Sequence, residues 1–426
     1  MIKSSLLLGG WLGFAPVPRR LLLTLCILVG AAPQTAPASI ARLSPSIQFS
    51  PFAASVLTHP APVAGTDGFV HLAYELVLTN VTALEIRIDK VQVRSAGTRR
   101  VLLSLSGGAL RANLNPVGGP VASDSAASSG PITVRGSQSV IVWLDVRVRR
   151  YSDVPAILDH RIVAAPVAPP PNAPRSLTTV VTPVATVRHR PIVLGPPVAP
   201  GIWYASEGCC SDFTHHRHGL TSVNGQLLVP QRFAIDWYRL DSQHRAWVGD
   251  PSKLSSYLAY RQPVLAAANA TVVETQDGLP NNPDIPKPPT IPPIQNTVGN
   301  HLVLKLSPGV FLLYAHLQRG SLHVHLGQRV RRGQVLGLIG TSGNSTAPHL
   351  HFQLMTTRTF FPTDSPPFVF DRFRLLGQVT QRIWDDNLGL QPTGTLPFTA
   401  ARRPSARRSQ MPLDRNVVSF SAVALP

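Results

Sequence analysis

Residues 343–354, GNSTAPHLHFQL, contain two histidines, His349 and His351, directly behind a turn rich in glycine, serine and proline. In a β-strand the side chains of residues i and i+2 point to the same face, so we expect these imidazoles to lie side by side. Such a pair can share one metal ion, or one ring can bind metal while the other transfers protons. The alternative is an ordinary strand in which two histidines flank Leu350, because short motifs also arise by chance.

Length and composition limit the classes of protein to which this chain can belong. A chain of 426 residues can hold two or three domains of roughly 100–200 residues each. A hydrophobic content of 44% excludes wholesale disorder, and 42 prolines with 31 glycines favour a loop-rich β architecture. Lys and Arg outnumber Asp and Glu by 39 to 21, which suits anionic surroundings. Because the arginines are scattered, apart from a run at residues 402–408, we expect no nucleic-acid partner.

The first 38 residues predict an export signal or an N-terminal membrane anchor. Basic residues precede an apolar run at residues 21–32, and the small residues of Ala36-Pro37-Ala38 follow it. The run is shorter than the ~20 residues of a membrane span. An uncleaved anchor is the alternative, because residues 6–14 add an earlier apolar patch. We therefore expect a periplasmic, cell-envelope or secreted protein.

Beyond that segment the chain has two cysteines, Cys209 and Cys210. A disulfide between adjacent cysteines closes a strained ring, so we expect the two thiols to stay unbridged. Two neighbouring thiols can bind a metal, but no second Cys or His pair stands at zinc-finger spacing. The pair is therefore a weak signal.

Residues 45–165 predict an immunoglobulin-like β-sandwich. Short stretches of period-two alternation, such as residues 70–78 and 139–146, are separated by turn residues, and no helical period appears. No cluster of catalytic residue types stands out here, which favours a structural or binding module. We divide the rest of the chain into a Pro-rich linker, a chemistry-bearing domain and a basic C-terminal tail, at residues 166–200, 201–375 and 376–426.

The chemistry-bearing domain contains another histidine on a β-like run, His316 within residues 312–317. Glycines in residues 327–340 mark tight corners between strands. A similar glycine pattern occurs in lipoyl and biotinyl carrier domains, which need a lysine at an exposed hairpin tip. No lysine follows Lys305, so the sequence argues against a carrier domain.

One carboxylate, Asp236, stands within the apolar run of residues 231–237. A buried carboxylate is costly unless a cation pairs with it, and a simple ion pair with Arg232 would meet this requirement. With two or three histidines, Asp236 would instead complete a catalytic zinc site of three protein ligands and one open position. Zinc lowers the pKa of its bound water to about 7, and a spare imidazole can then act as general base.

These features together resemble the LytM/lysostaphin-type zinc metallopeptidases. The resemblance rests on Asp236, on residues 314–317, on the glycine pattern and on residues 342–352, and residues 256–268 resemble the strand that enters this domain. It covers roughly residues 203–373, under half of the chain.

The resemblance implies an antiparallel β-sheet groove and therefore an all-β chain. It implies that Asp236 and His351 bind Zn²⁺. It further implies that His349 and His316 assist the bound water and polarise the scissile amide. The usual substrate of the family is a peptide of bacterial peptidoglycan.

The third zinc ligand departs from the family pattern. Most members place a histidine four residues before the Asp, where this chain has Arg232, which cannot bind zinc. The strong Asn-Gly turn of residues 223–226 folds the chain back, so that an upstream histidine can reach Asp236. Ideal register selects His215, whereas the sequence context resembles a variant branch of the family that selects His216, and a single bulge reconciles the two. We predict His216, with His215 as the alternative, and leave the neighbouring His218 out of the site.

The sequence thus predicts an exported, monomeric zinc metalloendopeptidase that acts on peptidoglycan. The alternative is an inactive LytM-like protein that binds peptidoglycan or activates another cell-wall hydrolase. Degenerate members usually lose several site residues, whereas Asp236, His316, His349 and His351 all persist here. Their persistence favours the enzyme.

Overall fold

The computed structural model describes residues 48–119, 130–210, 214–283, 293–380 and 393–421. Residues from Gln48 onward belong to one compact unit. The predicted export signal or anchor lies outside the described residues. Among the helices of the described ranges, none is both long and apolar enough to cross a membrane.

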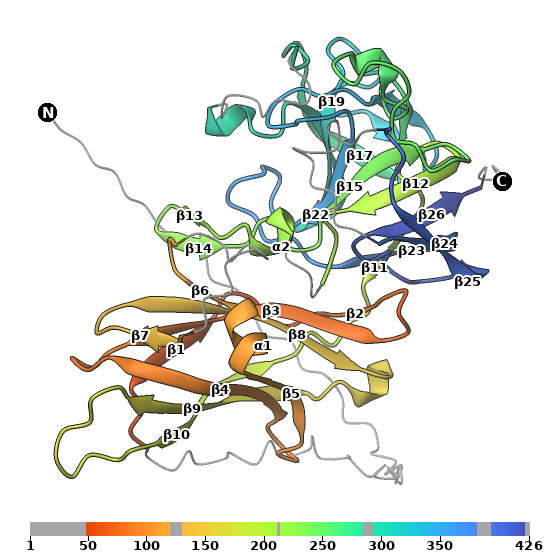
Figure 1. The fold of residues 1–426 in the computed structure, drawn as a ribbon. Coiled ribbons are helices and arrows are strands. Elements are labelled where there is room, and N and C mark those ends of the chain that lie inside the picture. The colour runs from red at the N-terminus through yellow and green to blue at the C-terminus, as the bar shows by residue number, and fades with distance from the viewer. Residues whose placement is uncertain (1–47, 120–129, 211–213, 284–292, 381–392, 422–426) are drawn as a thin grey trace, which may run out of the picture. The chain divides into compact units, whose positions relative to one another are not determined.

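The N-terminal part is a sandwich of two five-stranded antiparallel sheets (Figure 1). The first sheet contains β1 (Phe52–Val56), β2 (Pro62–Ala64), β3 (Val70–Asn80), β6 (Leu114–Pro116) and β8 (Ser139–Val148). The second contains β4 (Ile86–Ser95), β5 (Val101–Ser106), β7 (Thr133–Val134), β9 (Ile157–Pro166) and β10 (Leu177–Ala185), with the short helix α1 (Gly107–Ala112) following β5. Strand β10 lies in the interval that the sequence suggested as a linker, and it pairs with β9.

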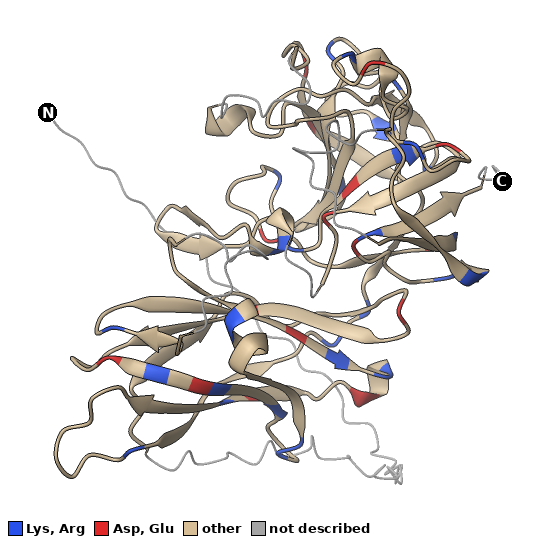
Figure 2. Cartoon of the chain, in the orientation of Figure 1, with Lys and Arg blue, Asp and Glu red and all other residues tan. Residues whose placement is uncertain are grey.

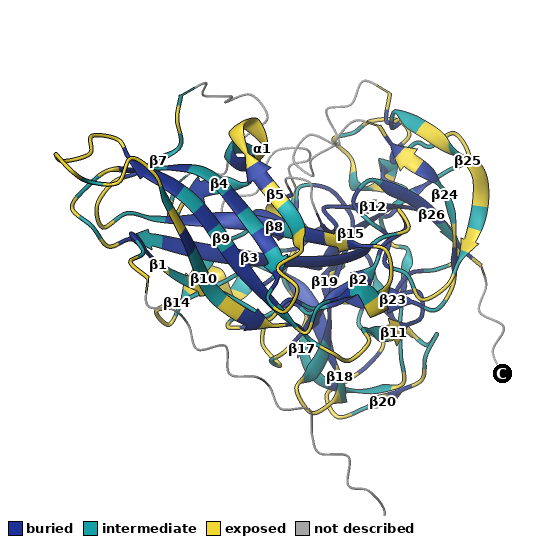
Figure 3. Ribbon diagram, turned by 90° about the horizontal axis from the view of Figure 1, so that it is seen from below, coloured by how far each residue is buried: buried dark blue, intermediate teal, exposed yellow. Residues whose placement is uncertain are grey.

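Strand β3 is buried on both faces, which Figure 3 shows as dark blue along most of its length. Leu72, Tyr74 and Leu76 face the core between the two sheets. Ala73 and Val77, on the opposite face, pack into clusters with residues of the C-terminal part. Most residues of β3 are apolar, as a strand covered on both sides requires, and its buried His71 and Glu75 have charged partners.

A ten-stranded sheet dominates the C-terminal part, with the order β20-β17-β18-β19-β22-β15-β12-β26-β24-β25 and antiparallel pairing throughout (Figure 1). Its strands are β12 (Gly201–Ser206), β15 (Ile235–Leu240), β17 (Ala270–Gln276), β18 (Asn300–Ser307), β19 (Val310–Leu317), β20 (Arg329–Val330), β22 (Leu350–Met355), β24 (Phe373–Val379), β25 (Phe398–Arg407) and β26 (Asn416–Phe420). The prediction of an all-β fold is confirmed, while the immunoglobulin-like character of the sandwich stays a prediction.

Small elements complete this part. Three two-stranded sheets pair β11 (Ile192–Leu194) with β23 (Phe368–Phe370), β13 (Thr221–Val223) with β14 (Gln226–Leu228), and β16 (Pro263–Leu265) with β21 (Val335–Leu338). The helical turns are α2 (His215–His218), η1 (Tyr151–Asp153), η2 (Leu254–Ser256) and η3 (Ile294–Asn296), of which η1 belongs to the sandwich. The β13–β14 hairpin turns at Asn224 and Gly225, both with positive φ, as the Asn-Gly signal predicts.

The interval set apart as a basic tail supplies strands to the large sheet. Strand β26 is largely buried and pairs with both β12 and β24, because Val417, Val418 and Phe420 have apolar surface to bury. The arginines of β25 are mostly exposed, and Figure 2 shows Lys and Arg scattered over many strands. The positive charge therefore marks solvated faces and does not separate this segment from the domain.

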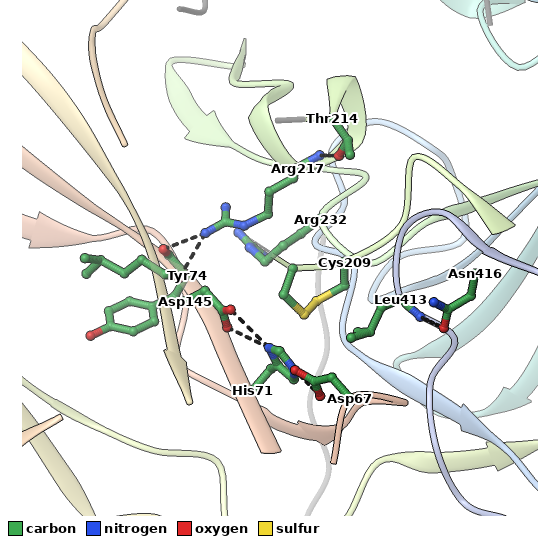
Figure 4. Close-up of a disulfide and its surroundings, with 12 residues drawn as sticks. Asp67, His71, Tyr74, Asp145, Cys209, Thr214, Arg217, Arg232, Leu413 and Asn416 are labelled. Carbon is green, nitrogen blue, oxygen red and sulfur yellow. Dashed lines mark hydrogen bonds and ion pairs between the residues drawn. A yellow bond between two sulfur atoms is a disulfide. The ribbon is translucent and has the colours of Figure 1, made fainter. Parts of the chain in front are cut away.

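The prediction that the two cysteines stay unbridged is wrong. A disulfide joins Cys209 to Cys210, whose Cα atoms lie 3.0 Å apart across a cis peptide bond (Figure 4). Both side chains are buried, and they line a cavity of about 400 Å³ together with His71. The sulfur of Cys210 lies near His71 and Asp145, but as part of the disulfide it is not a thiolate ligand.

Two carboxylates hold the buried imidazole of His71 (Figure 4). Its Nδ1 lies 3.0 Å from Asp145 Oδ1 and its Nε2 lies 3.1 Å from Asp67 Oδ1. Burial opposes a charge on the ring, but the hydrogen bonds and negative charges of both partners raise the pKa of His71 to about 9. The ring is therefore an imidazolium at neutral pH.

This ion triad predicts a loss of stability at alkaline pH. The folded pKa of His71, about 9, exceeds its unfolded value of 6.5. The contribution is therefore complete below pH 6.5 and declines until it is lost above about pH 9. A shift of this size corresponds to on the order of 3 kcal/mol. Urea unfolding at pH 6, 8 and 10 should show this decline in the wild type and not in His71→Gln. Parallel pH dependences in the two proteins would contradict it.

The role of β26 gives a second prediction. Phe420 is 3% exposed, and its ring centroid lies 5.5 Å from those of Trp237 and Phe370. Phe420→Ala should cost about 3–5 kcal/mol of unfolding free energy, because it opens a cavity in an aromatic cluster. Thermal and urea unfolding measure this cost. The control is Phe49→Ala at a side chain that is 69% exposed. An equal effect in both variants would show that β26 is not part of the core.

Candidate metal centre

Strand pairing brings Asp236 and His351 together. Both stand at directly opposed positions of β15 and β22, where Cβ atoms in an antiparallel pair are about 4.5–5.5 Å apart. Asp236 Oδ1 lies 2.9 Å from His351 Nδ1 and 3.5 Å from Nε2 of His349, which directly precedes β22. The sequence-predicted carboxylate and His-x-His pair therefore meet in the middle of the large sheet.

His316 joins the cluster from β19, on the other side of β22. Its ring centroid lies 4.9 Å from that of His349 and 5.8 Å from that of His351. The backbone of His316 has a φ of 60°, a left-handed conformation that non-glycine residues adopt at some cost. This conformation breaks the regular alternation of side chains along β19 at His316, whose ring lies beside those of His349 and His351.

Helix α2 supplies the histidines upstream. We expected an extended chain here, but residues 215–218 form a helical turn, with Thr214 capping the amide of Arg217. His216 is buried, and its Nε2 lies 3.4 Å from Asp236 Oδ2. His215 is 47% exposed, with Nε2 at 3.9 Å from the same oxygen and Nδ1 at 3.1 Å from a Glu207 carboxylate oxygen.

The helical turn explains why both of these histidines approach Asp236. Ligand atoms of His215, His216 and Asp236 all lie within 4.8 Å of one another. His218 is directed elsewhere, because its ring packs edge-on against Trp143 of the sandwich at a centroid distance of 4.5 Å. The structure thus places both sequence-predicted alternatives, His215 and His216, near Asp236, and His218 lies outside the cluster.

Arg232 does not pair with Asp236, so that reading of the sequence is wrong. Its buried guanidinium contacts the carboxylates of Glu75 and Asp364. No sequence signal indicated Glu75, which is separated from Arg232 by 157 residues. Asp236 is left to the histidines.

Each ring's N–H group is directed away from the centre. The Nδ1 atoms of His216, His316 and His349 lie 3.0, 2.8 and 2.8 Å from the carbonyl oxygens of Glu207, Ser342 and Ala347. A carbonyl oxygen only accepts hydrogen bonds, so in a neutral ring Nδ1 carries the proton and Nε2 keeps its lone pair. Among the described residues, His216 Nε2 has no hydrogen-bond partner.

In His351 the other ring nitrogen, Nε2, is directed away from the centre, and Gln353 sets this orientation. The amide nitrogen of Gln353 donates to the carbonyl of Pro230 at 2.9 Å, so its Oε1 faces His351 Nε2 at 2.8 Å. With the proton on Nε2, Nδ1 keeps its lone pair toward Asp236; with the proton on Nδ1, that atom donates the 2.9 Å hydrogen bond to Asp236 Oδ1. Sequence reasoning missed Gln353, although its position two residues after His351 puts both on one face of β22.

Burial favours neutral rings for His216 and His316, whereas charge interactions with the imidazoles favour an ionised Asp236. Burial lowers the pKa of His216 and of His316 well below the ordinary value. Burial also disfavours the ionised form of Asp236, but the neighbouring imidazoles, that of His216 first, hold its pKa well below the usual range.

A cation fits this arrangement. Nε2 of His216 and Nδ1 of His351 lie 3.4 and 2.9 Å from oxygens of Asp236, so a cation among them would contact two ring nitrogens and a carboxylate. Imidazole nitrogen and carboxylate oxygen are donors that Zn²⁺ prefers, and the outward hydrogen bonds are those that orient zinc-binding histidines.

Fold and centre together define an all-β protein whose antiparallel sheet carries a buried cluster of His and Asp side chains suited to a metal ion. Residues 256–362 match the model of Peptidase family M23, which marks this stretch as a Peptidase M23 domain. The matched range contains His316, His349 and His351. Asp236 and His216 precede it.

Relatives with known activities are similar over short stretches. Glycyl-glycine endopeptidase ALE-1 of Staphylococcus capitis is 42% identical over 73 residues, which are 17% of this chain and 20% of that protein. Peptidoglycan DD-endopeptidase ShyC of Vibrio cholerae serotype O1 is 39% identical over 57 residues, or 13% of each chain. The chain thus spans a fifth or less of the length of these curated relatives.

A solved structure, the catalytic domain of the prophage-encoded M23 protein EnpA from Enterococcus faecalis, is 16% identical. The match covers 42% of this chain and 93% of that one, with a TM-score of 0.24.

Proposed function

We propose that this protein is a zinc-dependent endopeptidase that hydrolyses peptide bonds of bacterial peptidoglycan. The observation that carries the proposal is the approach of ring nitrogens of His216 and His351 to within 3.4 Å of the buried Asp236 carboxylate. The family of the domain and the names of its relatives support peptidase activity on cell-wall peptides. We further propose that the protein acts outside the cytoplasm, as a monomer.

The proposed ligands are His216, Asp236 and His351. Zinc bound there would supply a Lewis acid and lower the pKa of a water molecule. Asp236 contributes the negative charge, and Gln353 and the Glu207 carbonyl fix the rings of His351 and His216 in ligating orientation.

His349 and His316 are the proposed proton carriers. The Ala347 and Ser342 carbonyls hold their Nδ1 protons, so each Nε2 is the atom that can accept a proton from the attacking water. The same nitrogen can return that proton to the leaving amine. The low pKa of His316 keeps its ring neutral, and a neutral ring can act as a base at physiological pH.

The ligand assignment predicts which variants lose metal. His216→Ala should weaken zinc binding by more than the 10–100-fold typical of lost outer-shell partners, because it removes a direct ligand. Zinc per chain, measured by atomic absorption after dialysis, provides the readout. His218→Ala removes a buried histidine outside the site and should retain zinc. Metal retained by His216→Ala and lost from His215→Ala would instead select His215.

The division of roles within the His-x-His pair gives another prediction. His349→Ala should keep zinc and reduce turnover about 10²–10⁴-fold, the usual contribution of a general acid–base residue. Release of peptides from purified sacculi measures turnover, with His351→Ala as the variant expected to lack metal and activity. Full turnover by His349→Ala would refute the role. A wild-type protein that holds zinc but digests no sacculi would indicate the inactive, peptidoglycan-binding alternative.

A further inference from the structure

A buried network of charged residues joins the sandwich to the two segments that carry the upstream ligands. Its centre is Glu75 of β3, whose side chain is fully buried. Two arginines of the C-terminal part reach it, Arg217 and Arg232, each 2% exposed or less. Arg217 directly follows His216 in α2, and Arg232 stands four residues before Asp236.

Glu75 binds both guanidinium groups at once. Its carboxylate accepts from Arg232 Nε at 2.9 Å and from Arg232 Nη2 at 2.7 Å, while Arg217 Nη1 donates to Oε1. The other terminal nitrogen of Arg217 donates to the carbonyls of Tyr74 and Leu144, at 3.0 and 3.1 Å (Figure 4). Paired, multidentate contacts of this kind fix the orientation of an arginine.

The α2 segment depends on such contacts. A helix of four residues has too few internal hydrogen bonds to be stable by itself, so its place must come from tertiary contacts. Arg217 provides them on the sandwich side, and the ring of His218 packs on Trp143 of the same sheet. On the opposite side of the turn, His216 faces Asp236.

Arg232 fixes the other segment in the same way. Besides Glu75 it contacts Asp364, which in turn accepts from Thr58 of the sandwich at 2.7 Å. Two carboxylates and two guanidinium groups thus balance their charge within the network. Loss of Glu75 alone would remove the ion-pair partner of Arg217 and leave Arg232 with Asp364, a costly arrangement that movement of the segments would relieve.

We propose that Glu75 is a positioning residue for the metal centre, through which the sandwich sets the distance between His216 and Asp236. The inference rests on the proposed function in so far as it concerns zinc. It assigns the sandwich a part in building the centre, and it assigns Arg232 a structural role at the position where most family members have a ligand.

The test compares Glu75→Gln, which keeps shape and removes charge, with Glu75→Asp. The matched control is Asp159→Asn, since Asp159 is a buried carboxylate that receives Arg94 Nε at 2.8 Å within the second sheet of the sandwich. Zinc affinity is measured by competition with a chelator. Glu75→Gln should weaken it about 10–100-fold, as loss of an outer-shell partner does, and Glu75→Asp should recover part of the loss. Asp159→Asn should stay within about twofold of wild type.

Hydrogen exchange of the metal-free proteins provides a readout that needs no zinc. Glu75→Gln should speed exchange at the amides of residues 215–218 and leave β4 and β9 unchanged, whereas Asp159→Asn should do the reverse. If Glu75→Gln does not fold, Arg217→Lys, which loses the multidentate contacts, takes its place. Equal exchange of α2 in the Glu75 variant and wild type would overturn the proposal. If wild-type protein binds no zinc, the proposed function fails, and exchange alone decides the role of Glu75.

Discussion

The structure of the centre depends on one buried carboxylate. Asp236 stands on a strand in the interior of a ten-stranded sheet, where an ionised group needs compensating charge. Among the described residues no arginine pairs with it, because Arg232 is engaged elsewhere. Imidazoles surround it instead, and each is held by an outward hydrogen bond that leaves a lone pair directed inward. Negative charge and lone pairs in one buried place account for a cation site without reference to any relative.

The same constraint explains the unusual position 232. The family resemblance leads one to expect a histidine there, and this chain has an arginine whose carboxylate partners are Glu75 and Asp364. An arginine can bridge the sandwich and the sheet because its long side chain carries a permanently charged planar fork, which here contacts Glu75 and Asp364. The proposed ligand of α2, His216, lies upstream, and Arg217 of the same helical turn is anchored to the same Glu75.

Local patterns in the sequence predicted much of this centre. Period-two spacing placed His349 beside His351, the Asn-Gly turn predicted the β13–β14 hairpin, and the apolar run around Asp236 predicted its strand. The failures involve contacts remote in sequence. Glu75 lies 142 residues from Arg217, and β26 pairs with a strand some two hundred residues upstream, so no local period could indicate either. The arginines of β25 also suggested a solvated tail, because an edge strand with one exposed face has the composition of a loop.

The two histidines of α2 differ in burial, and this difference bears on how water and substrate reach the centre. A centre that hydrolyses a peptide needs a position open to water and substrate, which a fully enclosed set of ligands would not leave. His216 is enclosed, with its Nδ1 fixed on a backbone carbonyl, whereas His215 is half exposed and pairs with Glu207 from the solvent side. A ring that is exposed can turn away at low cost, while a buried ring whose Nδ1 is held by a backbone carbonyl cannot. If the centre acts as proposed, its open position therefore lies on the His215 side of Asp236, and the sandwich anchors α2 from the other.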